Sequence, residues 1–249
     1  MSSSPIVLWQ CPPKTVLVAV DFGDASARAL AIAGVVASAF DARLRALHAE
    51  RFEPPPYFTI EQIARLEAER RLAQAAAADH LTQFAVRASA YRVESIVVDE
   101  PPVEAILNGS ATSDLIVVGT HGRRGPGRWW LGSVAERVVR AATIPVLVTR
   151  AAATPPRDVF ERLALVQDGR EADATARACA ARLASIVGGS LIEGGPVTQC
   201  EAGVMQRASL VVMSTRSDHP SWGITDSVAK VLGACQRPVL FIPAQLNTQ

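Results

Sequence analysis

The sequence predicts an α/β protein made of two tandem Rossmann-like open parallel-sheet domains, the second of them truncated. Short, continuous apolar runs alternate with helical patterns, which is the order expected of right-handed βαβ units on a parallel sheet. The pattern restarts in shorter form after residues 151–156, which read as a linker. The last strands of the two halves also have similar sequences, which indicates a tandem duplication.

The first expected strand spans residues 15–21, an apolar run that ends in Asp21. Such runs are typical of central parallel strands that are buried on both faces. Gly23 and Asp24 make a turn into a helix at 25–40, in which Gly34 is expected to permit a close contact between helix and sheet. The other elements of this half are predicted as a strand at 44–49, a long helix from Thr59 to about 87, a strand at 93–98, a helix at 103–110, a strand at 114–118, a helix from Ser133 and a strand at 145–149.

The long helix opens with Thr59-Ile60-Glu61-Gln62, which reads as a capping box. Apolar side chains then recur at helical spacing. They form one apolar face of the helix: Ile63, Leu66, Ala73, Ala77, Leu81 and Phe84.

The second half repeats this pattern in shortened form. Its expected elements are a strand at 163–167 ending near Asp168, a helix at 174–187, a weak strand at 190–192, a strand at 210–213, a helix from Asp226 and a strand at 238–242. Residues 114–120 match 209–215, and residues 144–148 match 237–241. The spacing from Asp168 to Ser214 is less than half that from Asp21 to Gly119, so about one helix and one strand are expected to be missing. We predict domains at 1–152 and 157–249.

Composition excludes several classes of partner. The chain has 249 residues, of which 49% are apolar, so two cores of ordinary size can form. The net charge is +1 and 5% of residues are aromatic, which favours neither nucleic acid nor an anionic membrane as a partner.

The cysteines lack the spacing of a zinc site and are expected to be reduced thiols: Cys11, Cys179, Cys200 and Cys235. No segment reads as a secretory signal or a membrane span, so we expect a soluble, cytoplasmic protein.

The loop after the strand at 114–118 has the composition of a phosphate cradle. Two residues separate Gly119 from Gly122, and nine more precede Gly132 and Ser133. Glycines let the backbone approach an anion closely, and N–H groups in a turn can converge on phosphate oxygens. A helix N-terminus adds further donors and a favourable dipole. Ser133-Val-Ala-Glu136 reads as a capping box that starts this helix.

This loop, with its flanking strand and helix, resembles the nucleotide-binding motif of the universal stress protein family. That motif is two glycines separated by two residues, then nine residues, then Gly-Ser or Gly-Thr. Residues 19–30 also resemble the first strand and turn of the family, and the resemblance covers 15–150 throughout and 160–243 weakly. It implies an adenine nucleotide alpha hydrolase-like fold and a stress-response regulatory protein whose first domain binds ATP, or AMP or ADP.

The resemblance also implies roles for particular residues. Asp21 would approach the adenine or ribose, and the backbone of Leu47 or His48 would pair with the adenine edge. The ribose and phosphates would be held by Gly119, Gly122, Gly132, Ser133 and Val134. These positions lie at the carboxyl ends of parallel strands, where open α/β sheets bind ligands.

The chain departs from the family pattern in two places. Asp99-Glu-Pro-Pro102 stands where the family has a Gly-x-Pro turn, and its two carboxylates would either repel phosphate or help hold a divalent metal. In the second half, the three loop glycines correspond to Ser214, Ser217 and Asp226. Side chains there narrow the approach and a carboxylate opposes an anion, so we expect no nucleotide in that half.

Several functions remain open at this level. No Walker lysine, Gly-x-Ser-x-Gly or His-Glu-x-x-His motif occurs, so no catalytic residue is assigned and slow ATP hydrolysis is the most catalysis expected. The alternatives to a nucleotide-binding regulator are a scaffold that binds no nucleotide and a slow ATPase. The resemblance further implies association through the fifth strands, either between the two halves as an internal pseudo-dimer or in a homodimer.

Overall fold

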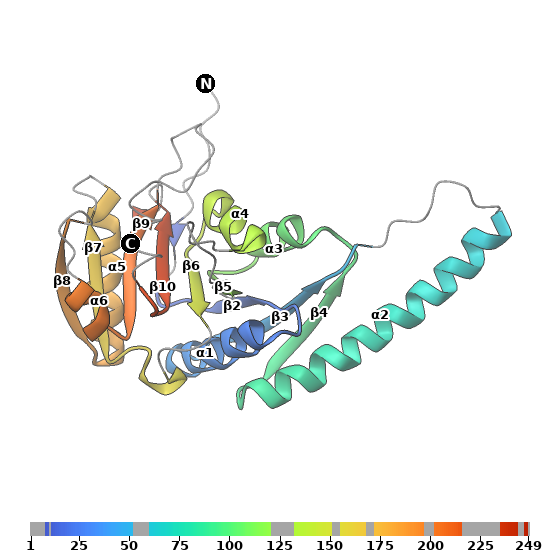
Figure 1. Ribbon diagram of the computed structural model, residues 1–249, viewed down its shortest axis with the longest axis horizontal. Coiled ribbons are helices and arrows are strands. Elements are labelled where there is room, and N and C mark those ends of the chain that lie inside the picture. The colour runs from blue at the N-terminus through green and yellow to red at the C-terminus, as the bar shows by residue number, and fades with distance from the viewer. Residues whose placement is uncertain are drawn as a thin grey trace, which may run out of the picture.

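The computed structural model describes residues 8–9, 11–51, 60–120, 132–150, 155–167, 172–196, 202–215, 235–243 and 247–248. Within these ranges, nine strands form one sheet in the order β4-β3-β2-β5-β6-β10-β9-β7-β8. Helices cover both faces of this sheet (Figure 1). Two further strands, β1 (Leu8–Trp9) and β11 (Asn247–Thr248), pair in parallel. The predicted α/β class is confirmed.

The first half follows the predicted element order. Its elements are β2 (Thr15–Ala19), α1 (Asp24–Phe40), β3 (Arg43–Ala49), α2 (Ile60–Ala88), β4 (Val93–Val98), α3 (Pro102–Ser110), β5 (Leu115–Thr120), α4 (Ser133–Ala141) and β6 (Val146–Arg150). Strand β2 ends two residues earlier than predicted, because the chain turns before Phe22, which has a positive φ of 62°.

The second half is shorter. It contains a 3₁₀ turn, η1 (Pro156–Asp158), then β7 (Arg162–Gln167), α5 (Ala172–Val187), β8 (Ser190–Pro196), α6 (Ala202–Arg207), β9 (Leu210–Thr215) and β10 (Val239–Pro243). The prediction missed α6 and made β8 too short, because Gly194 and Gly195 interrupt the apolar pattern. The predicted helix at Asp226 lies outside the described residues.

The two halves share strand order and register. The order β3-β2-β5-β6 recurs as β8-β7-β9-β10. Val16 pairs with Leu44 and Leu115, and its counterpart Leu163 pairs with Leu191 and Leu210. Among the described residues, α2 and β4 have no counterpart in the second half, where α6 is the one element between β8 and β9.

The two runs of strands meet at β6 and β10. These strands pair antiparallel, with Leu147 opposite Leu240 and Val148 opposite Val239. All other strand pairs of the nine-stranded sheet are parallel. Strand β10 occupies in the second half the sheet position that β6 occupies in the first, and the two pair within one chain.

The core consists of two apolar clusters, one on each face of the sheet. One cluster joins the strands to α1, α2 and α5. The other joins them to α3, α4 and α6. Val16, Val18, Ile116 and Val117 are completely buried, as expected of strands between two helical layers.

The apolar face predicted for α2 is only partly covered. Leu81 is fully buried and Phe84 packs against the core, whereas Ile63 is 45% exposed. Figure 1 shows the N-terminal part of α2 extending away from the sheet. A helix of 29 residues is about 44 Å long, more than twice the length of the six-residue strand β4 beside it. The sheet is therefore too short to cover the whole face.

Other sequence predictions have mixed outcomes. A Cβ at Gly34 would lie 2.2 Å from the Ser89 hydroxyl oxygen, so this glycine permits contact with the end of α2 rather than with the sheet. Cys11, Cys179 and Cys235 are free and buried, whereas Cys200 lies outside the described residues. The described part of the chain has no helix that is long and apolar enough to span a membrane.

Candidate functional site

A pocket lies at the carboxyl ends of β2, β3 and β5, next to the first turns of α3 and α4. It is lined by Ala19, Val20, Asp21, Ser26, Leu47, His48, Ala49, Pro102, Ile106, Val118, Gly119, Val134 and Ala135. Five of the eight predicted site residues are in this lining, and Gly132 and Ser133 directly precede Val134. Gly122 and the other residues of 121–131, including His121, Arg123, Arg124, Arg128, Trp129 and Trp130, lie outside the described residues.

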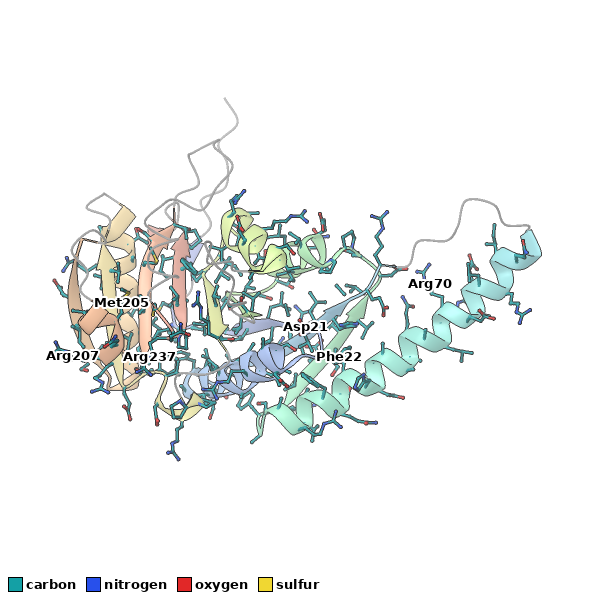
Figure 2. The ribbon with its side chains drawn as sticks, viewed as in Figure 1. Asp21, Phe22, Arg70, Met205, Arg207 and Arg237 are labelled. Carbon is teal, nitrogen blue, oxygen red and sulfur yellow. The ribbon has the colours of Figure 1, made fainter. Side chains whose placement is uncertain are left out.

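Asp21 is held at the pocket by its own turn. Its Oδ1 accepts a hydrogen bond from the backbone N–H of Gly23, at 3.0 Å, while the residue remains exposed. Gly23 is the N-cap residue of α1. Figure 2 shows Asp21 beside Phe22, with Phe22 toward α2. A carboxylate fixed in this way at a pocket edge can accept hydrogen bonds from hydroxyl or amino groups of a ligand.

His48 connects the pocket to an aromatic cluster under α2. Its Nδ1 lies 2.9 Å from the backbone oxygen of Val20, so an Nδ1–H donates to that oxygen and the ring orientation is fixed. The ring of Phe22 packs at 4.4 Å from that of His48 and stacks at 4.3 Å on His80. Phe84 meets Phe22 edge-on. These contacts hold Phe22 in a left-handed conformation that is unusual for a bulky residue. The sequence did not indicate this cluster.

The backbone of Leu47 and His48 belongs to the β3 ladder. The Leu47 oxygen accepts the N–H of Val20 at 2.9 Å, and His48 is opposite Val97 of β4. A carbonyl oxygen has two lone pairs, so an acceptor site remains at Leu47 beyond the ladder bond.

Gly119 lies against the first turn of α1. A Cβ there would be 2.4 Å from the backbone oxygen of Ala25 and 2.9 Å from the backbone nitrogen of Ser26. Both contacts are to backbone, so the helix would have to move to admit a side chain. Gly119 thereby allows the α1 N-terminus to approach β5 and close one wall of the pocket.

The start of α4 differs from the prediction. Gly132, with φ of 73°, is the N-cap residue, and Ser133 is already the first residue of the helix. The expected capping box, with Ser133 as the cap, is therefore wrong by one residue, and no side chain makes a cap hydrogen bond at this end. The backbone oxygen of Gly132 accepts the N–H of Glu136. Among the described residues, no capping side chain accepts from the N–H donors in the first turn of α4, which favours an anionic ligand.

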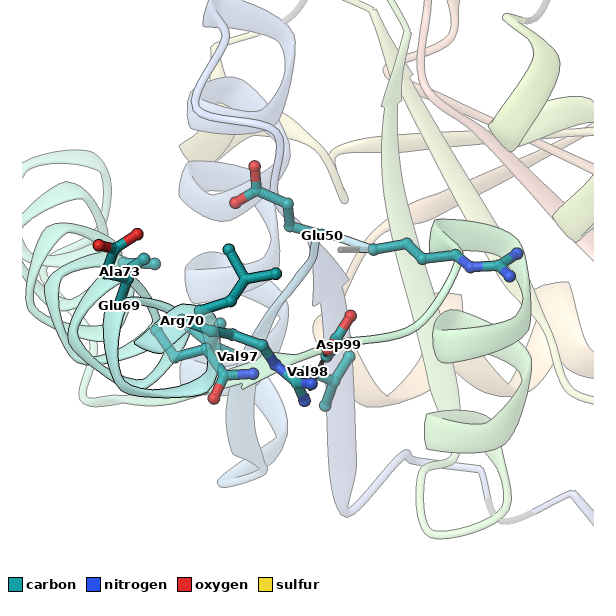
Figure 3. Close-up of a pocket in the computed structure, with 11 residues that line it drawn as sticks. Glu50, Glu69, Arg70, Ala73, Val97, Val98 and Asp99 are labelled. Carbon is teal, nitrogen blue, oxygen red and sulfur yellow. Dashed lines mark ion pairs between the residues drawn. The ribbon is translucent and has the colours of Figure 1, made fainter. Parts of the chain in front are cut away.

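The carboxylates of Asp99 and Glu100, which stand where the family has a Gly-x-Pro turn, both have partners. An oxygen of Asp99 lies 2.7 Å from an Nη of Arg70 on α2, and Glu100 accepts a hydrogen bond from Asn108. Figure 3 shows the Arg70–Asp99 pair in a second pocket between α2 and the ends of β3 and β4. Glu50, Glu69, Val97 and Val98 also line that pocket. The described residues hold no group of three or more histidine, cysteine, aspartate or glutamate side chains that could bind a metal.

A model of the universal stress protein family matches residues 13–150. The chain belongs to the universal stress protein family. A member from Thermus aquaticus is 37% identical over 145 residues, which are 55% of this chain and 98% of that protein. A Mycobacterium tuberculosis member is 35% identical over 141 residues, 54% of this chain and 45% of that protein. The chain thus matches less than half the length of the mycobacterial relative.

The likeness in fold extends further along the chain than the family match. The crystal structure of a universal stress protein from Archaeoglobus fulgidus covers 93% of this chain and 98% of its own, with a TM-score of 0.69 and 14% identity. A structure from Pseudomonas aeruginosa covers 92% and 93%, with a TM-score of 0.61 and 16% identity. At these identities the likeness concerns the fold alone, and it includes the second half.

Proposed function

We propose that the first half of the chain binds an adenine nucleotide, ATP, ADP or AMP, and that the protein is a nucleotide-dependent regulator of a stress response. One observation carries this proposal. Residues selected for base, ribose and phosphate contacts from three distant parts of the sequence line one pocket: Asp21, Leu47, His48, Gly119 and Val134. Membership of the universal stress protein family supports it.

The chemistry of the pocket fits the two ends of such a ligand. Its base end is largely apolar, with Leu47, Ile106 and Val118 in the lining, and a purine ring is a flat group that such walls accommodate. Asp21 stands at its edge as an acceptor. The uncapped start of α4 offers N–H donors at the other end, where phosphates would lie.

We further propose that domains at 1–152 and 157–249 arose by duplication and that the second binds no nucleotide. The shared strand order and register support duplication. Ser214 occupies the register position of Gly119, because each precedes the last residue of its strand. Gly119 is opposite Thr149 of β6, and Ser214 is opposite Ile242 of β10. A Cβ at this position hinders the close approach that Gly119 allows. Ser217 and Asp226, the counterparts of Gly122 and Gly132, lie outside the described residues.

Calorimetric titration of the full chain with ATP tests the proposal. We expect one nucleotide per chain. Gly132→Asp should weaken binding by about 2 kcal/mol or more, roughly 30-fold, because a carboxylate would occupy the anion site. Equal ATP affinity in the wild type and this variant, or two sites per chain, would contradict the proposal.

The chain offers a matched control for the strain of this substitution. Gly188 has φ of 67°, close to that of Gly132, and a Cβ there would meet no atom within 4 Å. Gly188→Asp therefore introduces the same side chain in nearly the same backbone conformation, outside the pocket. We expect it to bind ATP like the wild type.

A further inference from the structure

Arg150, the last residue of β6, is buried in an unusual way for an arginine. Its exposed fraction is 8%. Its Nε is buried without a hydrogen-bond partner, and no carboxylate of the described chain forms an ion pair with it. Burial lowers the pKa of this guanidinium, and an interaction with Cys235 opposes that change. A buried charge without a partner is costly, so its retention calls for an anion.

The sheet places this side chain near the phosphate end of the proposed site. Arg150 is opposite Thr120 in the β5–β6 pairing, so the two side chains leave the sheet on the same face. Val118 and Val148, two residues earlier on each strand, belong to the cluster that packs under α3 and α4. Arg150 and Thr120 therefore lie on the α4 side of the sheet.

Thr120 in turn lies at the start of α4. A Cβ at Gly132 would be 3.9 Å from the Thr120 Oγ1. The N-terminus of α4 has no side-chain cap. A buried guanidinium, a buried hydroxyl and an uncapped helix N-terminus thus belong to adjacent positions of the structure. A guanidinium and backbone N–H groups are the donors that proteins use for phosphate.

We propose that Arg150 binds the phosphate group of the nucleotide, together with the N-terminus of α4. This inference rests on the proposed function and adds a residue that lies outside the glycine loop. Arg150 then determines how strongly the site distinguishes a nucleotide from a nucleoside.

The second half lacks this residue, as the proposal requires. Gly119 is opposite Thr149 and Thr120 opposite Arg150, whereas Ser214 is opposite Ile242 and Thr215 opposite Pro243. Pro243 thus stands at the position of Arg150. The half without the loop glycine is also the half without the guanidinium.

Titration of the full chain with adenosine, AMP and ATP tests the role of Arg150. We expect Arg150→Gln to weaken AMP and ATP binding about 10- to 100-fold, because it removes charge-assisted hydrogen bonds, and to leave adenosine affinity unchanged. Arg150→Lys should retain part of the preference for phosphate, since it keeps the charge but not the planar fork. Arg137→Gln is the matched control, because it removes an arginine of α4 whose side chain is 59% exposed. It should leave all three affinities unchanged.

Thermal unfolding without nucleotide separates this role from a structural one. Arg150→Met should raise the unfolding midpoint, because the wild-type residue is a buried charge that awaits its anion. A lower midpoint would show that Arg150 stabilises the chain without a bound anion and would overturn the inference. Unchanged AMP and ATP affinities in Arg150→Gln would also overturn the inference. That outcome would leave the proposed nucleotide binding itself uncontradicted. A wild type that binds neither adenosine nor ATP would refute the proposed function and this inference together.

Discussion

The two halves of the chain have the same strand framework and different chemistry at its carboxyl edge. Strands β5 and β6 of the first half end in Gly119, Thr120, Thr149 and Arg150, and strands β9 and β10 of the second end in Ser214, Thr215, Ile242 and Pro243. Upstream of these ends, both pairs are buried apolar strands. The framework therefore depends on the apolar pattern, which tolerates many substitutions, whereas a ligand site depends on single positions at the strand ends.

The largest expected effect comes from exchanging glycine and serine between the equivalent positions 119 and 214. Gly119→Ser should lower the free energy of unfolding by about 2–3 kcal/mol, because its Cβ would overlap the backbone of Ala25. The reciprocal change, Ser214→Gly, should cost at most about 1 kcal/mol through chain entropy. Urea unfolding measures both. Equal costs would show that β5 and β9 meet their helices at the same distance, which would remove the structural contrast between the halves.

Much of this arrangement was predictable because it depends on local rules. Buried parallel strands are continuous apolar runs, and ligands bind at their carboxyl ends, so the edge of the sheet that carries the pocket was predictable from local rules. The choice of Asp21, Leu47 and Gly119 at that edge came from the resemblance to the family, and all three line one pocket. The start of α4 was off by one residue, because Gly132 and Ser133 are both good N-cap residues and only φ distinguishes their roles.

Other features depend on tertiary structure and were not predictable. The apolar pattern of α2 carries no information about the width of the sheet, so the exposure of Ile63 could not be anticipated. An arginine after an apolar strand normally reads as the exposed end of that strand, and the burial of Arg150 follows only from its neighbours β5 and β10. Phe22 takes its conformation from contacts with His48 and His80, which are far apart in the sequence.

A second, smaller effect concerns α2 and β4, which have no counterpart among the described residues of the second half. The Arg70–Asp99 pair joins α2 to the end of β4, and the Asp99 side chain is 15% exposed. Asp99→Asn should lower the free energy of unfolding by about 1 kcal/mol, near the upper end for a pair with one exposed partner. Glu69→Gln is the control in the same pocket, because Glu69 pairs with Arg65 on the exposed surface. It should cost about 0.3 kcal/mol. If both variants cost the same, the Arg70–Asp99 pair does not anchor α2.

The last prediction tests whether the two halves unfold together, as one continuous sheet implies. Cys11 precedes β2 and Cys179 lies on α5, yet both belong to one apolar cluster. Burial raises the pKa of the Cys11 thiol to about 11 and that of Cys179 to about 12. In the unfolded chain a thiol ionises near pH 8.5, so it loses its proton there first. The two thiols therefore do not lower the free energy of unfolding below about pH 8.5. As the pH rises from there towards the folded pKa values, the free energy of unfolding falls by up to about 1.4 kcal/mol per pH unit for each thiol. Cys11→Ala and Cys179→Ala should each remove part of this fall in one and the same urea transition between pH 8 and 10. Two transitions, each sensitive to one variant, would mean that the β6–β10 pairing joins two units that unfold separately.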